Sequence, residues 1–311
     1  MLNQQQYKLA KDRQREIMAI LNRFAQNLSG ENNIEKIYQM TFNFQDLGYV
    51  FQQLKEVHDF WFTEANMPKR NRVLLGDCLE IMPKIPDGYF DMILCDLPYG
   101  TTARNKWDEI IPFAPIWKQY ERIIKDNGAI VLTAAEPFTS MLITSNPKLF
   151  RYDLIWEKAT ATGFLNANRM PLRAHEQILV FYKKLPTYNP QKTQGSPYKM
   201  TRRDIGSNYN DAEVIQHTTN NEDGLRYPRS VLYFPHDKDK LHPTQKPVAL
   251  FEYLIKTYTN EGEIVLDNCA GSGTTGEACE NLGRKYVLIE KEQKYYDIIL
   301  NRLKLSQQSQ P

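Results

Sequence analysis

Two short turns in this sequence carry side chains that could do chemistry. The first, Asp96-Leu97-Pro98-Tyr99, follows an apolar run and is called the acidic turn below. It combines a carboxylate acceptor, a proline that stiffens the backbone and an aromatic ring with a polar tip. Parallel sheets bind ligands at the carboxyl ends of their strands, so a ligand site is one interpretation. A structural strand stop with a packed tyrosine is the other.

The second turn, residues 267–276, also follows an apolar run and is called the glycine turn. Gly271, Gly273 and Gly276 match the pattern G-x-G-x-x-G, and Glu290 ends the next predicted strand. Glycines let the backbone approach a nucleoside closely, and an acid at a strand end can accept hydrogen bonds from both ribose hydroxyls. The pattern therefore predicts a site for a ribose-bearing cofactor. The sequence G-K-[ST] is missing, which disfavours a nucleoside triphosphatase.

The elements that must position these turns are short apolar strands that alternate with helices. We predict strands at 72–77, 90–96, 128–133, 152–157, 177–182, 263–267 and 285–290, and helices at 114–125, 137–145, 247–258, 274–282 and 291–303. This alternation is typical of a mostly parallel sheet with helices on both faces. The chain leaves room for one helix after Glu290, so the remaining strands must come from earlier in the chain.

Two regions depart from this alternation. Residues 1–70 are polar, with apolar residues at helical spacing, and predict an N-terminal helical extension. Residues 184–241 are rich in Tyr, Asn, Thr and Gln, with basic residues scattered among them. A segment this long is usually functional or has a small fold of its own.

The composition sets broad limits. The chain has 311 residues, of which 41% are hydrophobic and 24% charged, so it can bury a sizeable core and is not disordered throughout. Its net charge of +2 neither indicates nor excludes nucleic acid. A membrane-spanning run of about 20 apolar residues and the apolar core of a signal peptide are both missing, so we expect a cytoplasmic protein with no membrane partner. Four cysteines without a C-x-x-C pair and five scattered histidines predict no metal site.

The two turns, together with His242-Pro243-Thr244-Gln245-Lys246-Pro247, resemble the S-adenosylmethionine-dependent DNA amino-methyltransferase family. Its members methylate the exocyclic amine of adenine (N6) or cytosine (N4). The family turns read [D/N/S]-P-P-[Y/F/W] and D-x-F-x-G-x-G, and here they stand as Asp96-Leu-Pro-Tyr99 and Asp267-Asn-Cys-Ala-Gly-Ser-Gly273. The acidic turn comes first in the chain, which corresponds to the family's β-type circular permutation.

The resemblance implies a Rossmann-like, mostly parallel seven-stranded sheet and a division of the chain. The expected parts are an N-terminal extension (1–70), a catalytic half (71–183), a target-recognition region (184–241), a cofactor-binding half (242–303) and a tail (304–311). Many members of this type dimerise, and the N-terminal helices are the candidate contact. The resemblance also implies a bacterial or phage-encoded enzyme that acts on double-stranded DNA.

Roles for the acidic turn follow from the same resemblance. The Asp96 carboxylate and the Leu97 carbonyl would accept hydrogen bonds from the amine of a flipped base, Pro98 would hold the turn, and Tyr99 would stack on the base. Leu97 replaces the family's first proline but keeps the carbonyl. Cys269 stands where an aromatic residue is common, which would loosen the cofactor pocket without removing its backbone donors.

Further residues are assigned to the cofactor, S-adenosylmethionine, and to DNA. Glu290 would hold the ribose and Asp77 the adenine amine, while Thr244 and Lys246 would meet the methionine carboxylate. The other predicted cofactor residues are Pro243, Asp267, Ala270, Gly271, Gly273 and Thr274. The predicted DNA contacts are Arg202 and Arg203 in the 184–241 segment, and Arg173 and His175 in a stretch before the 177–182 strand.

Several functions remain open at this point. The acid at position 96 favours adenine, whereas the cytosine-amine members more often carry serine there. Methylation of a cytosine ring carbon is excluded, because it needs a nucleophilic cysteine, usually after proline, and the chain has no Pro-Cys pair. A nicotinamide-dependent oxidoreductase would explain the glycines and Glu290, but not the acidic turn or residues 242–247. An inactive DNA-binding relative is supported only by Leu97.

Overall fold

The computed structural model describes residues 71–100, 108–204, 215–238, 241 and 244–304. All of them belong to one compact unit, Arg70–Leu305. The predicted N-terminal helical extension, Pro243 and residues 305–311 of the predicted tail lie outside the described residues. Across the described ranges, every helix is too short or too polar to cross a membrane.

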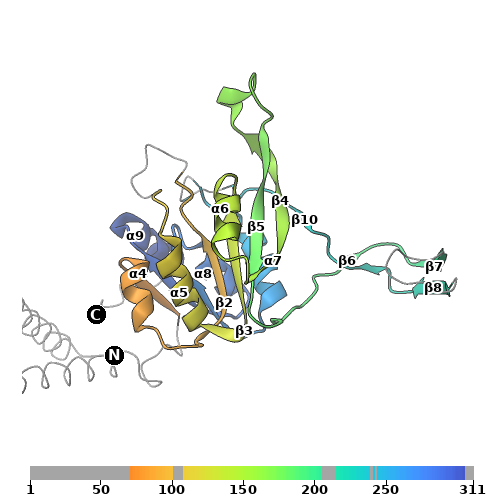
Figure 1. The fold of residues 1–311 in the computed structure, drawn as a ribbon, viewed down its shortest axis with the longest axis horizontal. Coiled ribbons are helices and arrows are strands. Elements are labelled where there is room, and N and C mark those ends of the chain that lie inside the picture. Colours follow the sequence, from red (N-terminus) through yellow and green to blue (C-terminus); the bar gives the residue numbers. More distant parts are fainter. Residues whose placement is uncertain (1–70, 101–107, 205–214, 239–240, 242–243, 305–311) are drawn as a thin grey trace, which may run out of the picture. The chain divides into compact units, whose positions relative to one another are not determined.

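A single large sheet forms the centre of the described unit (Figure 1). Its strands, in spatial order, are β1 (Arg72–Leu75), β12 (Lys285–Glu290), β11 (Ile264–Asp267), β2 (Phe90–Asp96), β3 (Ile124–Ala134), β5 (Arg173–Phe181), β4 (Phe150–Thr162) and β10 (Val231–Phe234). All neighbours are parallel except β5, which runs antiparallel to both β3 and β4. The prediction of a mostly parallel sheet is confirmed, and so is the supply of its other strands from earlier in the chain.

Helices cover both faces of this sheet, as predicted. They are α4 (Cys78–Ile81), α5 (Phe113–Ile123), α6 (Phe138–Ser145), α7 (Val248–Tyr258), α8 (Thr274–Asn281) and α9 (Gln293–Arg302), with short 3-10 turns η1 (Met82–Lys84) and η2 (Phe164–Asn166). Side chains of α7, α8 and α9 belong to one apolar cluster, and side chains of α4, α5 and α6 to another.

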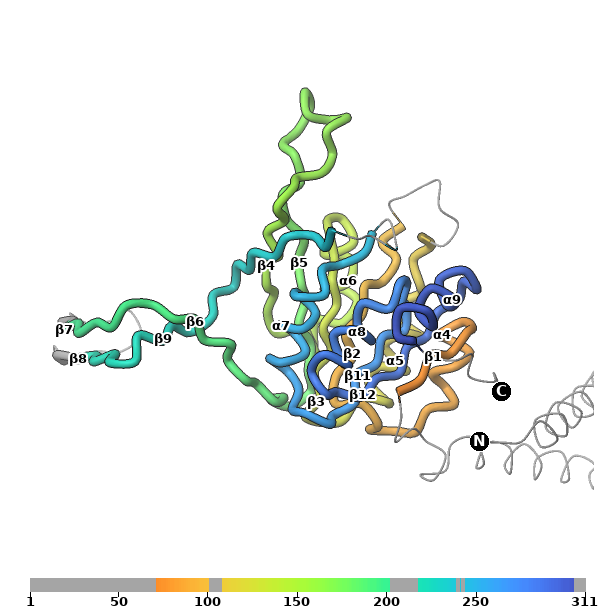
Figure 2. Tube along the Cα trace, turned by 180° about the vertical axis from the view of Figure 1, so that it is seen from behind, coloured from red at the N-terminus to blue at the C-terminus, as the bar shows by residue number. Residues whose placement is uncertain are grey.

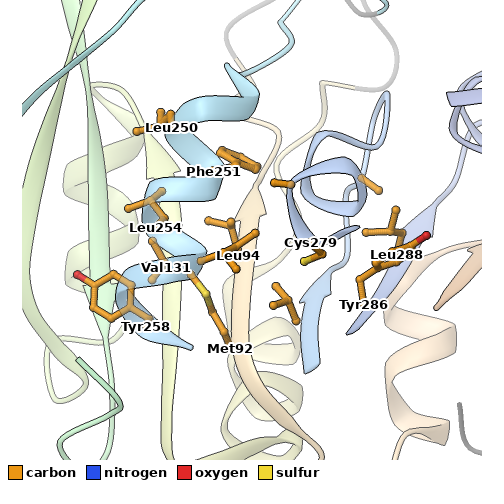
Figure 3. Packing of buried hydrophobic residues seen from close by; sticks show 14 of the residues in the cluster. Met92, Leu94, Val131, Leu250, Phe251, Leu254, Tyr258, Cys279, Tyr286 and Leu288 are labelled. Carbon is orange, nitrogen blue, oxygen red and sulfur yellow. The ribbon is translucent and has the colours of Figure 1, made fainter. Parts of the chain in front are cut away.

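Strand β2 shows how the sequence produces two cores. Met92 and Leu94 belong to the cluster under α7, whereas Ile93 and Cys95 belong to the cluster under α5. Successive strand residues point to opposite faces, so a continuous apolar run buries both faces of a central strand. Figure 3 shows Met92 and Leu94 packed beside the side chains of α7.

The structure corrects the prediction in two places. The sheet has eight strands rather than seven, because β10 pairs with β4. Strands β4 and β5 are longer than predicted and run beyond the rest of the sheet as a two-stranded ribbon (Figures 1 and 2). Residues 173–176, expected before a strand, are therefore part of β5.

Residues 184–241 contain β10 and four other strands. Strand β6 (Thr193–Gln194) pairs with β9 (Leu225–Arg226), and β7 (Tyr198–Asp204) pairs with β8 (Ile215–Asn221). Both pairs are antiparallel and separate from the large sheet. The segment thus has a small fold of its own, one of the two outcomes that its length and composition suggested.

Candidate active site

The acidic turn and the glycine turn lie at the same edge of the sheet. Strands β2 and β11 are parallel neighbours, with Val265 opposite Met92 and Leu266 opposite Ile93, so both strands end on one side. Residues of both turns line one cavity of about 630 Å³. A molecule bound on the glycine turn would therefore share this space with a group held at Asp96.

Asp96, the last residue of β2, is held by three side-chain donors. The Tyr99 hydroxyl donates to its Oδ1 at 2.8 Å, and the Thr133 hydroxyl donates to the same oxygen. Lys246 Nζ donates to Oδ2 at 2.7 Å. The carboxylate is 23% exposed, so it stays accessible from the cavity while its position is fixed.

Leu97 explains how the turn is kept without the family's first proline. Its side chain is buried in the same apolar cluster as Ile116 of α5 and Phe138 of α6. Packing of this side chain replaces the stiffness of a proline ring. Leu97 and Pro98 both line the cavity.

The Tyr99 ring is positioned by contacts as well as by its hydroxyl. It stacks on Phe138 with 5.1 Å between ring centroids and 24° between ring planes, and Lys246 Nζ lies 5.4 Å from its centroid. Burial, together with the neighbouring Asp96 carboxylate, raises the pKa of the Tyr99 phenol well above its ordinary value. The phenol is neutral at neutral pH and donates its proton to Asp96.

A buried ion network extends from Asp96 across the sheet. Lys246 Nζ lies 3.3 Å from Glu176 Oε2, and Glu176 Oε1 lies 3.4 Å from Lys158 Nζ. Burial lowers the pKa of Lys246, but Asp96 and Glu176 outweigh it and the net pKa is raised. Burial raises the pKa of Glu176, but the two lysines outweigh it and the net pKa is lowered. Two buried cations therefore balance two carboxylates.

Sequence reasoning missed Glu176 and Lys158. Glu176 lies on β5 and Lys158 on β4, and only the pairing of these strands brings them together. Lys246 was predicted to meet the cofactor, and it lines the cavity, but in this structure its ammonium group contacts the two carboxylates. Lys158 and Glu176 each lie just outside a predicted strand, at 152–157 and 177–182, so no local pattern marked either residue or its partner.

The glycines of the glycine turn have different structural roles. Gly271 and Gly273 adopt left-handed backbone, with φ of 53° and 81°, which favours glycine. Gly276 lies inside α8, where an added Cβ would be 2.8 Å from side-chain atoms of Leu288 and Leu303. The first two glycines therefore shape the turn, and the third lets the helix pack closely on β12.

Three of the acids that line the cavity, Glu290, Asp267 and Asp77, are predicted cofactor residues. Glu290 accepts hydrogen bonds from the Gly271 and Glu292 backbone N–H groups, both at 2.8 Å, and burial raises its pKa. Asp267 accepts from the Cys269 N–H at 3.1 Å and from the Thr275 hydroxyl, and burial raises its pKa to about 7. Asp77 caps α4 by accepting from the Leu79 N–H at 2.9 Å.

Residues just before α7 connect the two turns. The Ser272 hydroxyl of the glycine turn donates to Gln245 Oε1 at 3.1 Å, while the adjacent Lys246 donates to Asp96 of the acidic turn. Gln245 Nε2 also donates to Asp237 Oδ2 at 2.9 Å. Two consecutive residues therefore fix the relative position of both turns.

The remaining predicted site residues divide between the cavity and other surfaces. Thr244, Ala270, Thr274 and Arg173 line the cavity. His175 is exposed on β5, and the backbone of Arg202 and Arg203 lies in β7, outside the large sheet. The cavity lining, as far as the structure describes it, includes none of these last three residues.

Comparisons with known proteins agree with this geometry. Residues 90–301 match a family model described as DNA methylase. The chain is 28% identical over 269 residues to the Type II methyltransferase M.HinfI of Haemophilus influenzae, covering 75% of this chain and 68% of that protein. It is 27% identical over 250 residues to the Type II methyltransferase M.HpaI of Haemophilus parainfluenzae, covering 75% and 74%.

Solved structures show the same fold. The M1.HpyAVI–SAM complex matches with a TM-score of 0.51 and 24% identity, covering 75% of this chain and 99% of that chain. The PvuII DNA methyltransferase, described as cytosine-N4-specific, matches with a TM-score of 0.57 and 16% identity, covering 75% and 86%.

Proposed function

This chain belongs to the DNA methylase family, and from that premise we propose that it transfers a methyl group from S-adenosylmethionine to the exocyclic amine of adenine at a specific site in DNA. The observation that carries the proposal is the single cavity bordered by both the acidic turn and the glycine turn. An acceptor for an amine and a binding turn for a nucleoside cofactor then open into one space.

The cavity residues fit S-adenosylmethionine. A volume of 630 Å³ is within the range of about 300–1,000 Å³ that is usual for small-molecule sites. Glu290 would hold the ribose, since two backbone N–H groups leave acceptor capacity on its carboxylate. Asp77 would accept from the adenine amine, and Thr244 would meet the methionine carboxylate. When bound, S-adenosylmethionine supplies a methyl group on a positively charged sulfur.

The acidic turn would prepare the base for attack on that methyl group. The Asp96 carboxylate and the Leu97 carbonyl would each accept one N–H of the exocyclic amine. This draws the nitrogen towards tetrahedral geometry and localises its lone pair, which is otherwise delocalised into the ring. Tyr99, Thr133 and Lys246 hold the carboxylate in place, so the acceptor needs little reorganisation during the reaction.

Adenine is the proposed target, and the cytosine amine is the second candidate. The acid at position 96 supports adenine, whereas the likeness to a cytosine-N4-specific structure at 16% identity supports only the fold. The deciding measurement is mass spectrometry of nucleosides from DNA of cells that express the native chain or Asp96→Ala. We expect N6-methyladenine with the native chain alone. Detection of N4-methylcytosine instead would show that the target is the cytosine amine.

The two other functions considered from the sequence predict different results. A nicotinamide-dependent oxidoreductase would bind labelled nicotinamide cofactor rather than labelled S-adenosylmethionine. An inactive DNA-binding relative would bind DNA without methyl transfer in both the native chain and Asp96→Ala. Either result would overturn the proposed activity.

We assign target recognition to the 184–241 segment. Its antiparallel strands β6–β9 stand apart from the large sheet, and β7 carries Arg202 and Arg203. These arginines are proposed to contact DNA phosphates or bases, together with Arg173 and His175 of β5. The proposal predicts that changing Arg202 and Arg203 to alanine weakens binding to DNA and reduces its dependence on salt.

A further inference from the structure

The loop that joins β4 to β5, residues 163–172, is called the hairpin tip. The pair Thr162 and Arg173 closes it, and it begins at Gly163, whose φ of 91° allows a sharp turn into η2. Figures 1 and 2 show it at the end of the β4–β5 ribbon, beyond the rest of the sheet.

Large apolar side chains are concentrated on this tip. Phe164 is 80% exposed and Leu165 is 98% exposed, and Met170 and Leu172 are exposed as well. Single exposed apolar residues are normal on a protein surface. Four within ten residues, at the end of a ribbon, indicate a surface that becomes buried when the protein binds something.

The charge around the tip indicates an anionic partner. Residues 159–175 include no aspartate or glutamate, and they include Arg169, Arg173 and His175. Residues 162–175 are all exposed. An apolar tip flanked by Arg169 and Arg173, with no acid nearby in sequence, matches a duplex, in which stacked apolar bases lie between phosphates.

The root of the tip lies at the cavity. Thr162 and Arg173 both line the cavity that contains Asp96, and Arg173 Nη2 donates to the Glu136 carbonyl at 3.0 Å. A duplex whose target base enters this cavity would therefore place its neighbouring base steps close to the tip.

We propose that the hairpin tip enters duplex DNA next to the target base pair and occupies the space that the target base vacates when it turns into the cavity. This inference rests on the proposed function. Extruding a base leaves its neighbours unstacked, and apolar side chains inserted between base steps replace the lost contacts. Phe164 and Leu165, the most exposed apolar residues of the tip, are the inserting side chains.

The narrow shape of the tip favours DNA over a protein partner. A stable protein interface buries about 800 Å² on each side, which calls for a broad surface. One 3-10 turn at the end of a two-stranded ribbon offers few side chains, whereas the gap left by one base accepts one or two. A second copy of this chain is the competing occupant, and it is an outcome of the test below.

The test compares the double variant Phe164→Ala/Leu165→Ala with Met141→Ala and the native chain. Met141 is 43% exposed on α6 and does not line the cavity, so its change removes an exposed apolar group that is not part of the hairpin tip. The substrates are a matched duplex with the recognition sequence, identified by sequencing methylated DNA from expressing cells, and the same duplex with a mismatch opposite the target base. Single-turnover methyl transfer from labelled S-adenosylmethionine is measured on both.

On the matched duplex we expect the double variant to transfer methyl groups about tenfold or more slowly than the native chain. On the mismatched duplex its rate should stay within about threefold of the native rate, because an unpaired base is extruded more easily. Met141→Ala should equal the native chain on both. Equal rates for the two variants, an equal loss on both duplexes, or a dimer that the double variant converts to a monomer in light scattering would overturn the proposal. A native chain inactive on both duplexes would refute the proposed function itself.

Discussion

The two turns that border the cavity are held in place by different means. The glycine turn depends on left-handed backbone at Gly271 and Gly273, and its Gly271 N–H and Ser272 hydroxyl also donate to the side chains of Glu290 and Gln245. The acidic turn depends on side chains from other elements, namely Thr133 of β3 and Lys246 before α7. Both turns are therefore held by side chains from other elements, but only the glycine turn also needs a left-handed backbone conformation.

The largest expected effect separates the chemistry of the acidic turn from binding at the glycine turn. Asp96→Ala removes the carboxylate acceptor, and we expect methyl transfer to fall by about a thousandfold while S-adenosylmethionine still binds. Labelled transfer and calorimetry measure the two properties. Asp153→Ala, which removes an exposed acid of β4, is the matched control and should change neither. A loss of cofactor binding equal to the loss of transfer would show that the two turns are not separable.

The next effect concerns the polar groups that hold the acidic turn. Lys246→Gln leaves Asp96 and Glu176 without their shared cation, and we expect the free energy of unfolding to fall by about 3–5 kcal/mol. Denaturant unfolding measures this. Lys184→Gln removes a lysine that is 72% exposed and paired with Asp126, and it should change little. Equal stabilities of the two variants would contradict a structural role for the buried network.

The same variant has a pH signature. Because the pKa of Glu176 is lowered in the folded chain, this group stabilises the fold above its unfolded pKa, and the stabilisation is lost as pH falls through the lowered value. Without Lys246 the loss should begin at a higher pH. Acid unfolding followed by circular dichroism would show the shift, and unchanged midpoints would contradict it.

A smaller effect tests whether the glycine turn is fixed by backbone conformation. Gly273→Ala and Gly262→Ala both force a left-handed φ, of 81° and 80°, on a residue with a side chain, at a cost of about 1 kcal/mol each. Only at Gly273 does the added Cβ meet other atoms, 3.1 Å from Ile299, whereas at Gly262 nothing lies within 4 Å. We expect Gly273→Ala to be the less stable variant and the only one that weakens S-adenosylmethionine binding. Equal cofactor affinities would contradict this.

A further pH effect concerns the buried acid of the glycine turn. Burial raises the pKa of Asp267 from 3.8 to about 7, so the folded chain binds more protons than the unfolded chain between these values. The contribution of Asp267 to stability therefore falls as pH rises from about 4 to about 7 and is constant above that. Asp267→Asn should remove this slope, measured as the difference from the native chain in denaturant unfolding at several pH values. A persisting slope would assign it to another group, such as Glu290.

The contrast between the turns also explains what the sequence could predict. Gly271, Gly273 and Glu290 lie within one strand–turn–helix–strand unit, so their spacing alone predicted the turn and the acid beside it. The pairing of Lys246 with Glu176 depends on how β5 crosses the sheet. No local sequence pattern indicates where β5 lies in the sheet, so the ion network was not predicted.

Two features of the fold were missed for related reasons. Strand β10 is an apolar run of only four residues, Val231–Phe234, in a segment otherwise rich in polar residues, and only its Leu232 is buried. Its place is set by a distant residue, Trp156, whose indole N–H donates to the Phe234 carbonyl at 2.9 Å. The outer part of β5 is exposed and polar, so it shows none of the burial pattern that revealed residues 177–181.

The order of the strands has a consequence for how the protein is made. Strand β1 pairs only with β12, and β2 has β11 on one side. Strands near the beginning of the described unit therefore cannot complete their pairing until strands near its end have been synthesised. On the ribosome, the middle of the sheet is filled last. Until Ile264 to Glu290 have emerged, β2 presents an open edge and the nascent chain is exposed to wrong pairing. A truncation near the C-terminus would therefore remove interior strands of the sheet rather than an edge strand.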